Sequence, residues 1–204
     1  MTFAKPYPFR ASRSRFMKNC FILFILVFPI LGCDGEKLSL SQTVAQYYQG
    51  FNDSDFKLIA SVVHDSISLV EGDYPTSFSR NGFHEHFKWD SIFEPSYKLV
   101  HMEELDSDII ATVSSYSKRY EFLRNNPLTC RHKFSFEADK ISNIEVLDCL
   151  DTDWALWERE RDALVLWTKA HHPELDGFMH DLTMEGAIDY LKAIELYEKW
   201  ECGR

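Results

Sequence analysis

The stretch that decides the fold is VAQYYQGFNDSD, residues 44–55. Its large apolar side chains recur three and four positions apart, which is the spacing of a helix face that packs on a core. The polar NDS triplet interrupts this pattern, and the pattern returns over residues 56–63. The sequence therefore predicts two consecutive amphipathic helices. The apolar positions of the first helix are Val44, Tyr47, Tyr48 and Phe51.

The chain that follows changes from helical to strand periodicity. Ser66–Val70 alternates serine with apolar residues, which predicts a strand that Pro75 closes. A third helix is predicted from Ser79 to about Ile92. Beyond it the apolar period becomes two, which predicts four strands joined by short polar turns. These strands are Tyr97–Leu105, Ile109–Phe122, Leu128–Phe136 and Ile141–Leu150.

Three stretches resemble the NTF2-like (SnoaL-like) superfamily: residues 44–55, VHDSI at 63–67 and FEADKI at 136–141. The resemblance covers residues 39–150 and implies an α+β fold. In this fold a curved antiparallel sheet forms a cone over three N-terminal helices, with an apolar pocket at the open end. The superfamily includes isomerases, dehydratases, hydrolases, cyclases, binders and dimerisation modules, so the resemblance alone selects no activity.

The N-terminal part of the chain resembles a bacterial lipoprotein signal. Five basic residues and no acid precede the apolar run FILFILVFPILGC at 21–33, which is too short to span a bilayer as a helix. We expect cleavage after residue 32, a lipid on Cys33 and a short tether over residues 33–38. Ordinary signal cleavage and an uncleaved anchor are the alternatives. Because the segment from Met17 would be a compact signal alone, we expect translation to start there.

This signal implies a protein of the bacterial cell envelope that faces the periplasm or the exterior. Without residues 1–32 the chain keeps 17 basic and 32 acidic residues, a formal charge of −15. Such a charge disfavours nucleic acid as a partner and also disfavours docking on anionic lipid. The membrane is therefore expected to be a partner only through the lipid on Cys33.

Residues 151–204 lie outside the resemblance and are predicted to form a helical extension. Four of the five tryptophans are here, and isolated helices of this length need a surface to pack on. One interpretation is that the extension packs on the helices or the mouth of the cone. The other is a surface for a partner or a second copy. The apolar stripe of the last helix is Ala187, Tyr190, Leu191, Ile194 and Tyr197.

Cys130 and Cys149 lie on neighbouring predicted strands of a protein expected in an oxidising compartment. If Asp139-Lys140 forms the hairpin loop, the two cysteines face each other and a disulfide is expected. If Ala138-Asp139 forms the loop, they are displaced diagonally and a disulfide is harder to form. Cys202 is expected to stay free.

No motif indicates a metal ion or another cofactor. His84 and His86 lie two positions apart on a predicted helix, so they point to nearly opposite sides and cannot share an ion. The sequence contains no Gly-rich phosphate loop and no Gly-x-Ser-x-Gly elbow. We therefore expect neither a cofactor nor nucleophilic hydrolase chemistry.

Likeness to the ketosteroid-isomerase-like members of the superfamily implies one catalytic arrangement. It places Tyr47 and His132 where an enolate would be stabilised, and Glu71 where a base would remove a proton beside a carbonyl. The departures are a glutamate as the base and a histidine as the second donor. Tyr47 and Glu71 also have a plain structural interpretation, Tyr47 as a core residue and Glu71 as a solvated strand end.

From the sequence alone, we prefer a binding module to an enzyme. A cone lined by aromatic residues suits a small apolar ligand, oriented by His132 or by tyrosine hydroxyls. The alternative is that the same aromatic residues fill the core of an interaction scaffold, which would form a homodimer through the outer face of its sheet. The predicted pocket residues are Tyr47, Tyr48, Phe51, Phe83, Phe87, Tyr116, Tyr120 and Phe134.

Overall fold

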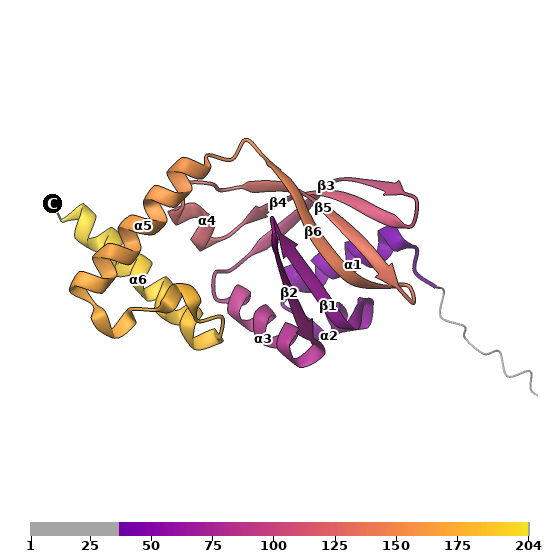
Figure 1. Ribbon diagram of the computed structural model, residues 1–204, viewed down its shortest axis with the longest axis horizontal. Coiled ribbons are helices and arrows are strands. Elements are labelled where there is room, and N and C mark those ends of the chain that lie inside the picture. Colours follow the sequence, from indigo (N-terminus) through magenta and orange to yellow (C-terminus); the bar gives the residue numbers. More distant parts are fainter. Residues whose placement is uncertain (1–36, 204) are drawn as a thin grey trace, which may run out of the picture. The chain divides into compact units, whose positions relative to one another are not determined.

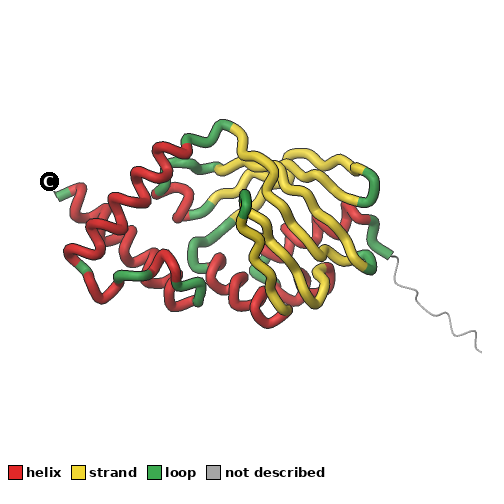
Figure 2. Tube along the Cα trace, viewed as in Figure 1, coloured by secondary structure: helices red, strands yellow, loops and turns green. Residues whose placement is uncertain are grey.

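The computed structural model describes residues 37–203. The signal segment, the start at Met17, and Cys33 with most of its tether lie outside these residues, so the expectations about them stay predictions. In the described part, six strands form one sheet, and helices precede, interrupt and follow it (Figures 1 and 2). The elements are α1 Leu40–Asn52, α2 Phe56–Val62, β1 Val63–Glu71, β2 Tyr74–Ser79, α3 Arg80–Ser91, β3 Ser96–Leu105, β4 Asp108–Tyr116, α4 Lys118–Phe122, β5 Leu128–Glu137, β6 Lys140–Leu150, α5 Trp154–His171 and α6 Met184–Cys202.

Local hydrogen bonds fix both ends of α1. The Ser39 hydroxyl accepts a bond from the backbone N–H of Gln42, and the Gln42 side chain accepts one from the N–H of Ser39. This reciprocal capping box satisfies N–H groups that a helix start leaves without partners. At the other end, the Asn52 side chain donates to the carbonyl of Tyr97 and accepts from its N–H, at 2.8 and 2.7 Å. The end of α1 is thereby tied to the start of β3.

The strand order in the sheet is β2-β1-β6-β5-β4-β3. All neighbouring pairs are antiparallel except β1 and β6, which run parallel. The expectation of a wholly antiparallel sheet is therefore wrong at this one pair. Most of the cone lies between β1 and β6 in the chain, so no tight hairpin imposes opposite directions on them.

Two boundaries differ from the sequence prediction. The chain continues past Pro75 in strand β2, where Pro75 pairs with Val70 of β1. Because β2 pairs only with β1, it is an edge strand, where proline is tolerated. The predicted strand Ile109–Phe122 ends at Tyr116, where the Ser117 hydroxyl caps the short helix α4.

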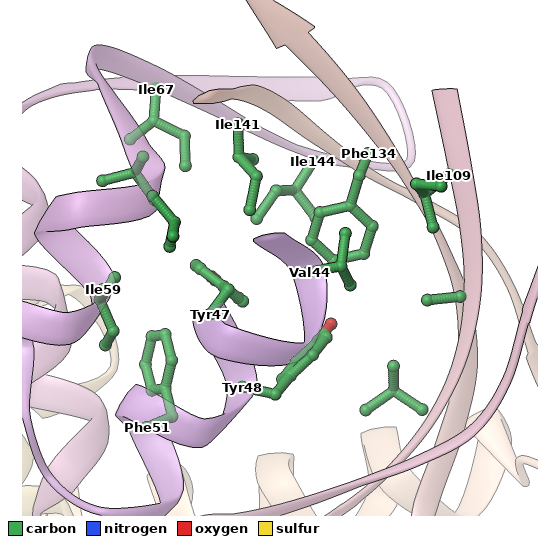
Figure 3. Close-up of a cluster of buried hydrophobic side chains, with 14 of the residues drawn as sticks. Val44, Tyr47, Tyr48, Phe51, Ile59, Ile67, Ile109, Phe134, Ile141 and Ile144 are labelled. Carbon is green, nitrogen blue, oxygen red and sulfur yellow. The ribbon is translucent and has the colours of Figure 1, made fainter. Parts of the chain in front are cut away.

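The core of the cone lies between α1 and the inner face of the sheet. Figure 3 shows Val44, Tyr47 and Tyr48 on α1 pointing toward side chains from the strands. The predicted helix face is therefore the buried face. Its labelled partners on the sheet are Ile67, Ile109, Phe134, Ile141 and Ile144.

Helices α5 and α6 form a second hydrophobic cluster with one end of the cone. Phe93, which follows α3, packs edge-to-face on Tyr190 of α6 with ring centroids 5.4 Å apart. Phe122 of α4 packs in the same way on Tyr197 at 5.9 Å. We call this group the extension cluster. Its buried members are Trp89, Phe93, Phe122, Leu123, Leu164, Trp167, Leu175, Phe178, Ala187, Tyr190, Ala193, Ile194 and Tyr197.

Large aromatic side chains of the extension therefore pack against the cone. Within residues 37–203, none of the helices is both long enough and apolar enough to cross a bilayer.

Candidate ligand cavity

A cavity of about 820 Å³ opens between α1, α3, the inner face of the sheet and the start of α5. Its wall is mostly apolar, with polar groups at separate places. A cavity of this size, with few polar groups in an apolar wall, is typical of sites for small organic molecules. The residues around it include Tyr47, Tyr48, Phe51, Leu69, Glu71, Tyr74, His86, Trp89, Asp90, Tyr97, Arg119, Cys130, His132, Ile144, Val146, Leu147, Trp154, Trp157 and Leu182.

Three of the eight predicted pocket residues line this cavity: Tyr47, Tyr48 and Phe51. Phe83 and Phe134 are instead fully buried in the core of the cone. Phe83 packs against Phe56 and Phe78, on the side of α3 that faces α2 and β2, which explains why it does not reach the cavity. Phe87 belongs to the same core.

The other two predicted pocket residues lie outside the cavity wall. Tyr116 is exposed because it ends β4 on the outer side of the sheet. Tyr120 lies on α4, within the span 109–122 that was predicted to be a single strand. Its ring packs on Trp157 of α5, with centroids 5.8 Å apart.

The three predicted catalytic residues all line the cavity, but in different surroundings. Glu71 is exposed at the end of β1, whereas Tyr47 is buried. His132 lies on β5, and its Nδ1 is 2.7 Å from the hydroxyl of Tyr48. Burial lowers the pKa of His132 to about 4 and raises the pKa of Tyr48 well above 10. The hydroxyl and the imidazole therefore form a neutral hydrogen-bonded pair at neutral pH.

A second polar region, at the α3–α4 end of the cavity, was not predicted from the sequence. Asp90 on α3 accepts a 2.6 Å hydrogen bond from the Tyr97 hydroxyl. His86 and Arg119 lie in the same part of the wall. In the sequence, the HEH triplet at residues 84–86 is the feature that marks this region. As expected for positions two apart on a helix, His84 and His86 contact different neighbours. His84 stacks on Phe56, while His86 stacks on Trp89.

Cys130 and Cys149 form a disulfide in the cavity wall. The hairpin loop is Ala138-Asp139, and both residues have left-handed backbone conformation. With this loop alone, the cysteines would be displaced diagonally. Two register shifts in the β5–β6 pair, between Arg131 and His132 and between Ser135 and Phe136, realign the strands. The cysteines are therefore direct partners. Cys202 is free and exposed.

The C-terminal extension completes the mouth of the cavity. Trp154 and Trp157 at the start of α5 line it, together with Leu182 just before α6. Trp154 and Leu182 are each about half exposed. On the cone, Leu147 of β6 also lines the cavity and is exposed to a similar degree. The extension thus both packs on the helices of the cone and contributes to the wall of the cavity.

Comparison with solved structures finds proteins described as NTF2-like and cystatin-fold, each at a TM-score below 0.5. An NTF2-like protein of unknown function from Cytophaga hutchinsonii is 9% identical, with a TM-score of 0.46 over 55% of this chain and 92% of that one. An uncharacterised cystatin-fold protein from Novosphingobium aromaticivorans is 13% identical, with a TM-score of 0.46 over 54% and 99%. An epoxide hydrolase/cyclase-like enzyme of pyran ring formation in the polyether salinomycin is 14% identical, with a TM-score of 0.45 over 53% and 88%.

No protein-family model matches the chain, and no curated protein sequence matches it. At these identities and TM-scores the similarity carries no conclusion about this chain. Its own elements and strand order confirm the predicted α+β architecture with a helical extension. What the cavity does has to be argued from its own residues.

The pKa of His132 predicts a pH dependence of stability. Its folded pKa of about 4 lies below its ordinary value of 6.5, so between these values the unfolded chain binds a proton that folded His132 does not. The free energy of unfolding should therefore fall as the pH falls through this window, by up to roughly 3 kcal/mol from this group. Urea denaturation at pH 7 and pH 4 should show that His132→Gln loses this part of the pH dependence.

The matched control is His101→Gln, because His101 is exposed on β3. It should keep the pH dependence of the wild-type protein. The same fall in stability in His132→Gln as in the wild type would contradict the assignment.

Proposed function

We propose that the protein binds a small, mostly apolar organic molecule in the cavity between the cone and the start of the extension. The observation that carries this proposal is the open cavity of about 820 Å³, whose wall combines aromatic and aliphatic side chains with a few polar groups. A scaffold filled by its own aromatic residues would leave no such space. Burial of apolar ligand surface against this wall would supply most of the affinity.

The inner wall presents rigid surfaces to a ligand. Tyr47 and Tyr48 pack edge-to-face with ring centroids 5.1 Å apart, and Tyr48 is held by its bond to His132. On β6, Ile144 and Val146 supply aliphatic surface. Because these groups are fixed by the core before a ligand arrives, binding would cost little ordering of side chains.

A cavity-filling substitution tests this proposal. Val146 pairs with His132 across β5 and β6 and lines the cavity, so Val146→Trp should occupy the space of the ligand. The probe is N-phenyl-1-naphthylamine, an uncharged dye whose fluorescence rises in apolar surroundings. We expect the wild-type protein to bind it in detergent-free buffer, and Val146→Trp to weaken binding about tenfold or more, equivalent to about 1.4 kcal/mol.

The control places the same bulk on the other face of the strand. Glu145 pairs with Lys133 and does not line the cavity, so Glu145→Trp should bind the dye like the wild type. Equal loss in both variants, or no binding to the wild type, would refute a cavity site. The homodimer through the outer sheet face stays a prediction.

Proton-transfer catalysis is the second candidate function, favoured by the presence of Glu71, Tyr47 and His132 around one cavity. Glu71 would remove a proton beside a ligand carbonyl, and Tyr47 would donate a hydrogen bond to the enolate. The neutral His132 would do so only in the tautomer that leaves a ring N–H free of Tyr48.

Turnover of a β,γ-unsaturated ketone to its conjugated isomer, followed by absorbance, tests this candidate. Glu71→Gln should lower the rate by about a hundredfold or more, the usual contribution of a general base. Asp73→Asn is the control, because Asp73 lies in the exposed turn after β1 and outside the cavity wall. Unchanged turnover in Glu71→Gln would eliminate Glu71 as the base.

We also propose that a lipid on Cys33 holds this domain at a membrane of the bacterial cell envelope. The support is the basic segment followed by the apolar run that ends at Cys33, together with the oxidised cysteine pair in the folded domain. Disulfides persist in such compartments and are rare in the cytosol.

Growth with labelled palmitate tests the lipid attachment. We expect the wild-type protein to carry the label and to sediment with membranes, and Cys33→Ser to lose both properties. Cys202→Ser removes the free, exposed cysteine and should keep both. Label retained by Cys33→Ser would contradict lipidation at this residue.

A further inference from the structure

Arg119 lies in the cavity wall and forms no ion pair with any described residue, although the charge of the nearby Asp90 carboxylate acts on its guanidinium. It lies on α4, and its guanidinium carbon is 4.8 Å from the centroid of the Trp89 ring and 5.0 Å from that of Tyr120. The Phe93 ring is 5.5 Å away. Aromatic faces attract a guanidinium, and three of them fix the position of this one.

The hydrogen bonding of Arg119 is incomplete. A guanidinium carries five N–H donors. Within residues 37–203, the one acceptor for them is the Tyr120 hydroxyl, 3.2 Å from Nη2. The Nε atom is buried and lacks a hydrogen-bond partner in the same part of the chain. Nη1 also has no acceptor in residues 37–203 but is not among the buried atoms, so it is the donor that a ligand in the cavity can reach.

Other arginines on the cone show the difference. Arg131 is bonded to Asp148 at 2.7 Å, and Arg80 forms an ion pair with Asp65. Arg119 forms no ion pair with any residue that the structure describes. Asp90 lines the same end of the cavity, but its carboxylate accepts the hydroxyl of Tyr97 instead.

Two more buried polar atoms beside Arg119 lack partners among the described residues: Nδ1 of His86 and Nε1 of Trp89. The two rings stack with centroids 5.9 Å apart, and both residues line the cavity. Among the described residues, all three unpartnered buried polar atoms of the cone therefore lie at one end of the cavity, and the other two belong to Trp167 and Thr168 of α5. These atoms are covered by protein, but they show that this end of the wall is polar beside the accessible Nη edge of Arg119.

We propose that Arg119 binds the carboxylate of an apolar organic acid, whose hydrocarbon part occupies the cavity between Tyr47 and Ile144. This inference rests on the proposed binding function and names the class of ligand. A guanidinium matches a carboxylate with two parallel hydrogen bonds, and a desolvated pair of this kind is stronger than one between neutral groups. The carboxylate approaches the Nη edge of Arg119, since Nε is covered.

Isothermal titration calorimetry with 2-naphthoate and 2-naphthylmethanol tests the inference, because the two compounds share one hydrocarbon body and differ in charge. We expect the wild-type protein to bind 2-naphthoate about tenfold or more tightly than the alcohol. Arg119→Met should remove this preference and leave binding of the alcohol within about twofold. Arg119→Lys keeps the charge without the planar fork and should retain part of the preference.

The matched control is Lys118→Met, which removes the neighbouring cation of α4, an exposed residue paired with Glu94. It should bind both compounds like the wild type. If Arg119→Met does not fold by circular dichroism, the wild-type preference and the Arg119→Lys variant still decide the matter.

The outcomes separate this inference from the proposed function. Binding of N-phenyl-1-naphthylamine without a preference for 2-naphthoate over the alcohol would overturn the role of Arg119 and leave the cavity site intact. A preference that survives Arg119→Met would also overturn it. Failure of all three compounds to bind the wild-type protein would overturn both proposals.

Discussion

Trp89 is the residue on which the cone, the extension and the cavity jointly depend. It is 6% exposed and belongs to the extension cluster, yet it also lines the cavity and lies under the guanidinium of Arg119. The packing that holds α5 and α6 therefore also fixes the polar end of the cavity. Trp157 lines the cavity and packs on Tyr120, whose hydroxyl accepts a hydrogen bond from Arg119. Loosening the extension would therefore change the wall and weaken the support of Arg119.

The polar groups of the cavity wall form two regions, one neutral and one charged. On the β5 side, Tyr48 and His132 satisfy each other as a neutral pair, because burial keeps the pKa of the imidazole near 4. At the α3–α4 end, Asp90 and Arg119 retain groups able to bind a charged or strongly polar partner. The two regions adjoin, because the ring of Tyr48 packs on that of Tyr97 with centroids 5.4 Å apart. A ligand with one polar end would be oriented by this difference, since among the described residues of the wall Arg119 is the one arginine or lysine, and it forms no ion pair with them.

The sequence predicted the parts of the fold that depend on periodicity. The buried face of α1, the helix α3 and the strands of the main sheet follow from apolar spacing, and the structure contains them. Periodicity did not reveal α4, because a five-residue helix offers only one turn of pattern and depends on the cap at Ser117. Arg119 was missed for the same reason. The register of β5 and β6 also escaped prediction, since two bulges shift it and neither leaves a clear mark in the sequence.

Binding of an acid by so acidic a chain requires a short-range mechanism. The whole chain has a formal charge of −10, so its long-range field repels an anion and does not speed its arrival. Repulsion from exposed carboxylates such as Glu71 is screened over roughly 8 Å at physiological ionic strength. The guanidinium of Arg119 lies among the rings of Trp89, Phe93 and Tyr120, so a carboxylate bound to it is partly buried and is screened less than a surface pair. Affinity would therefore come from the partly buried pair and the apolar wall, and would favour acids whose hydrocarbon part fills the cavity over small, fully hydrated anions.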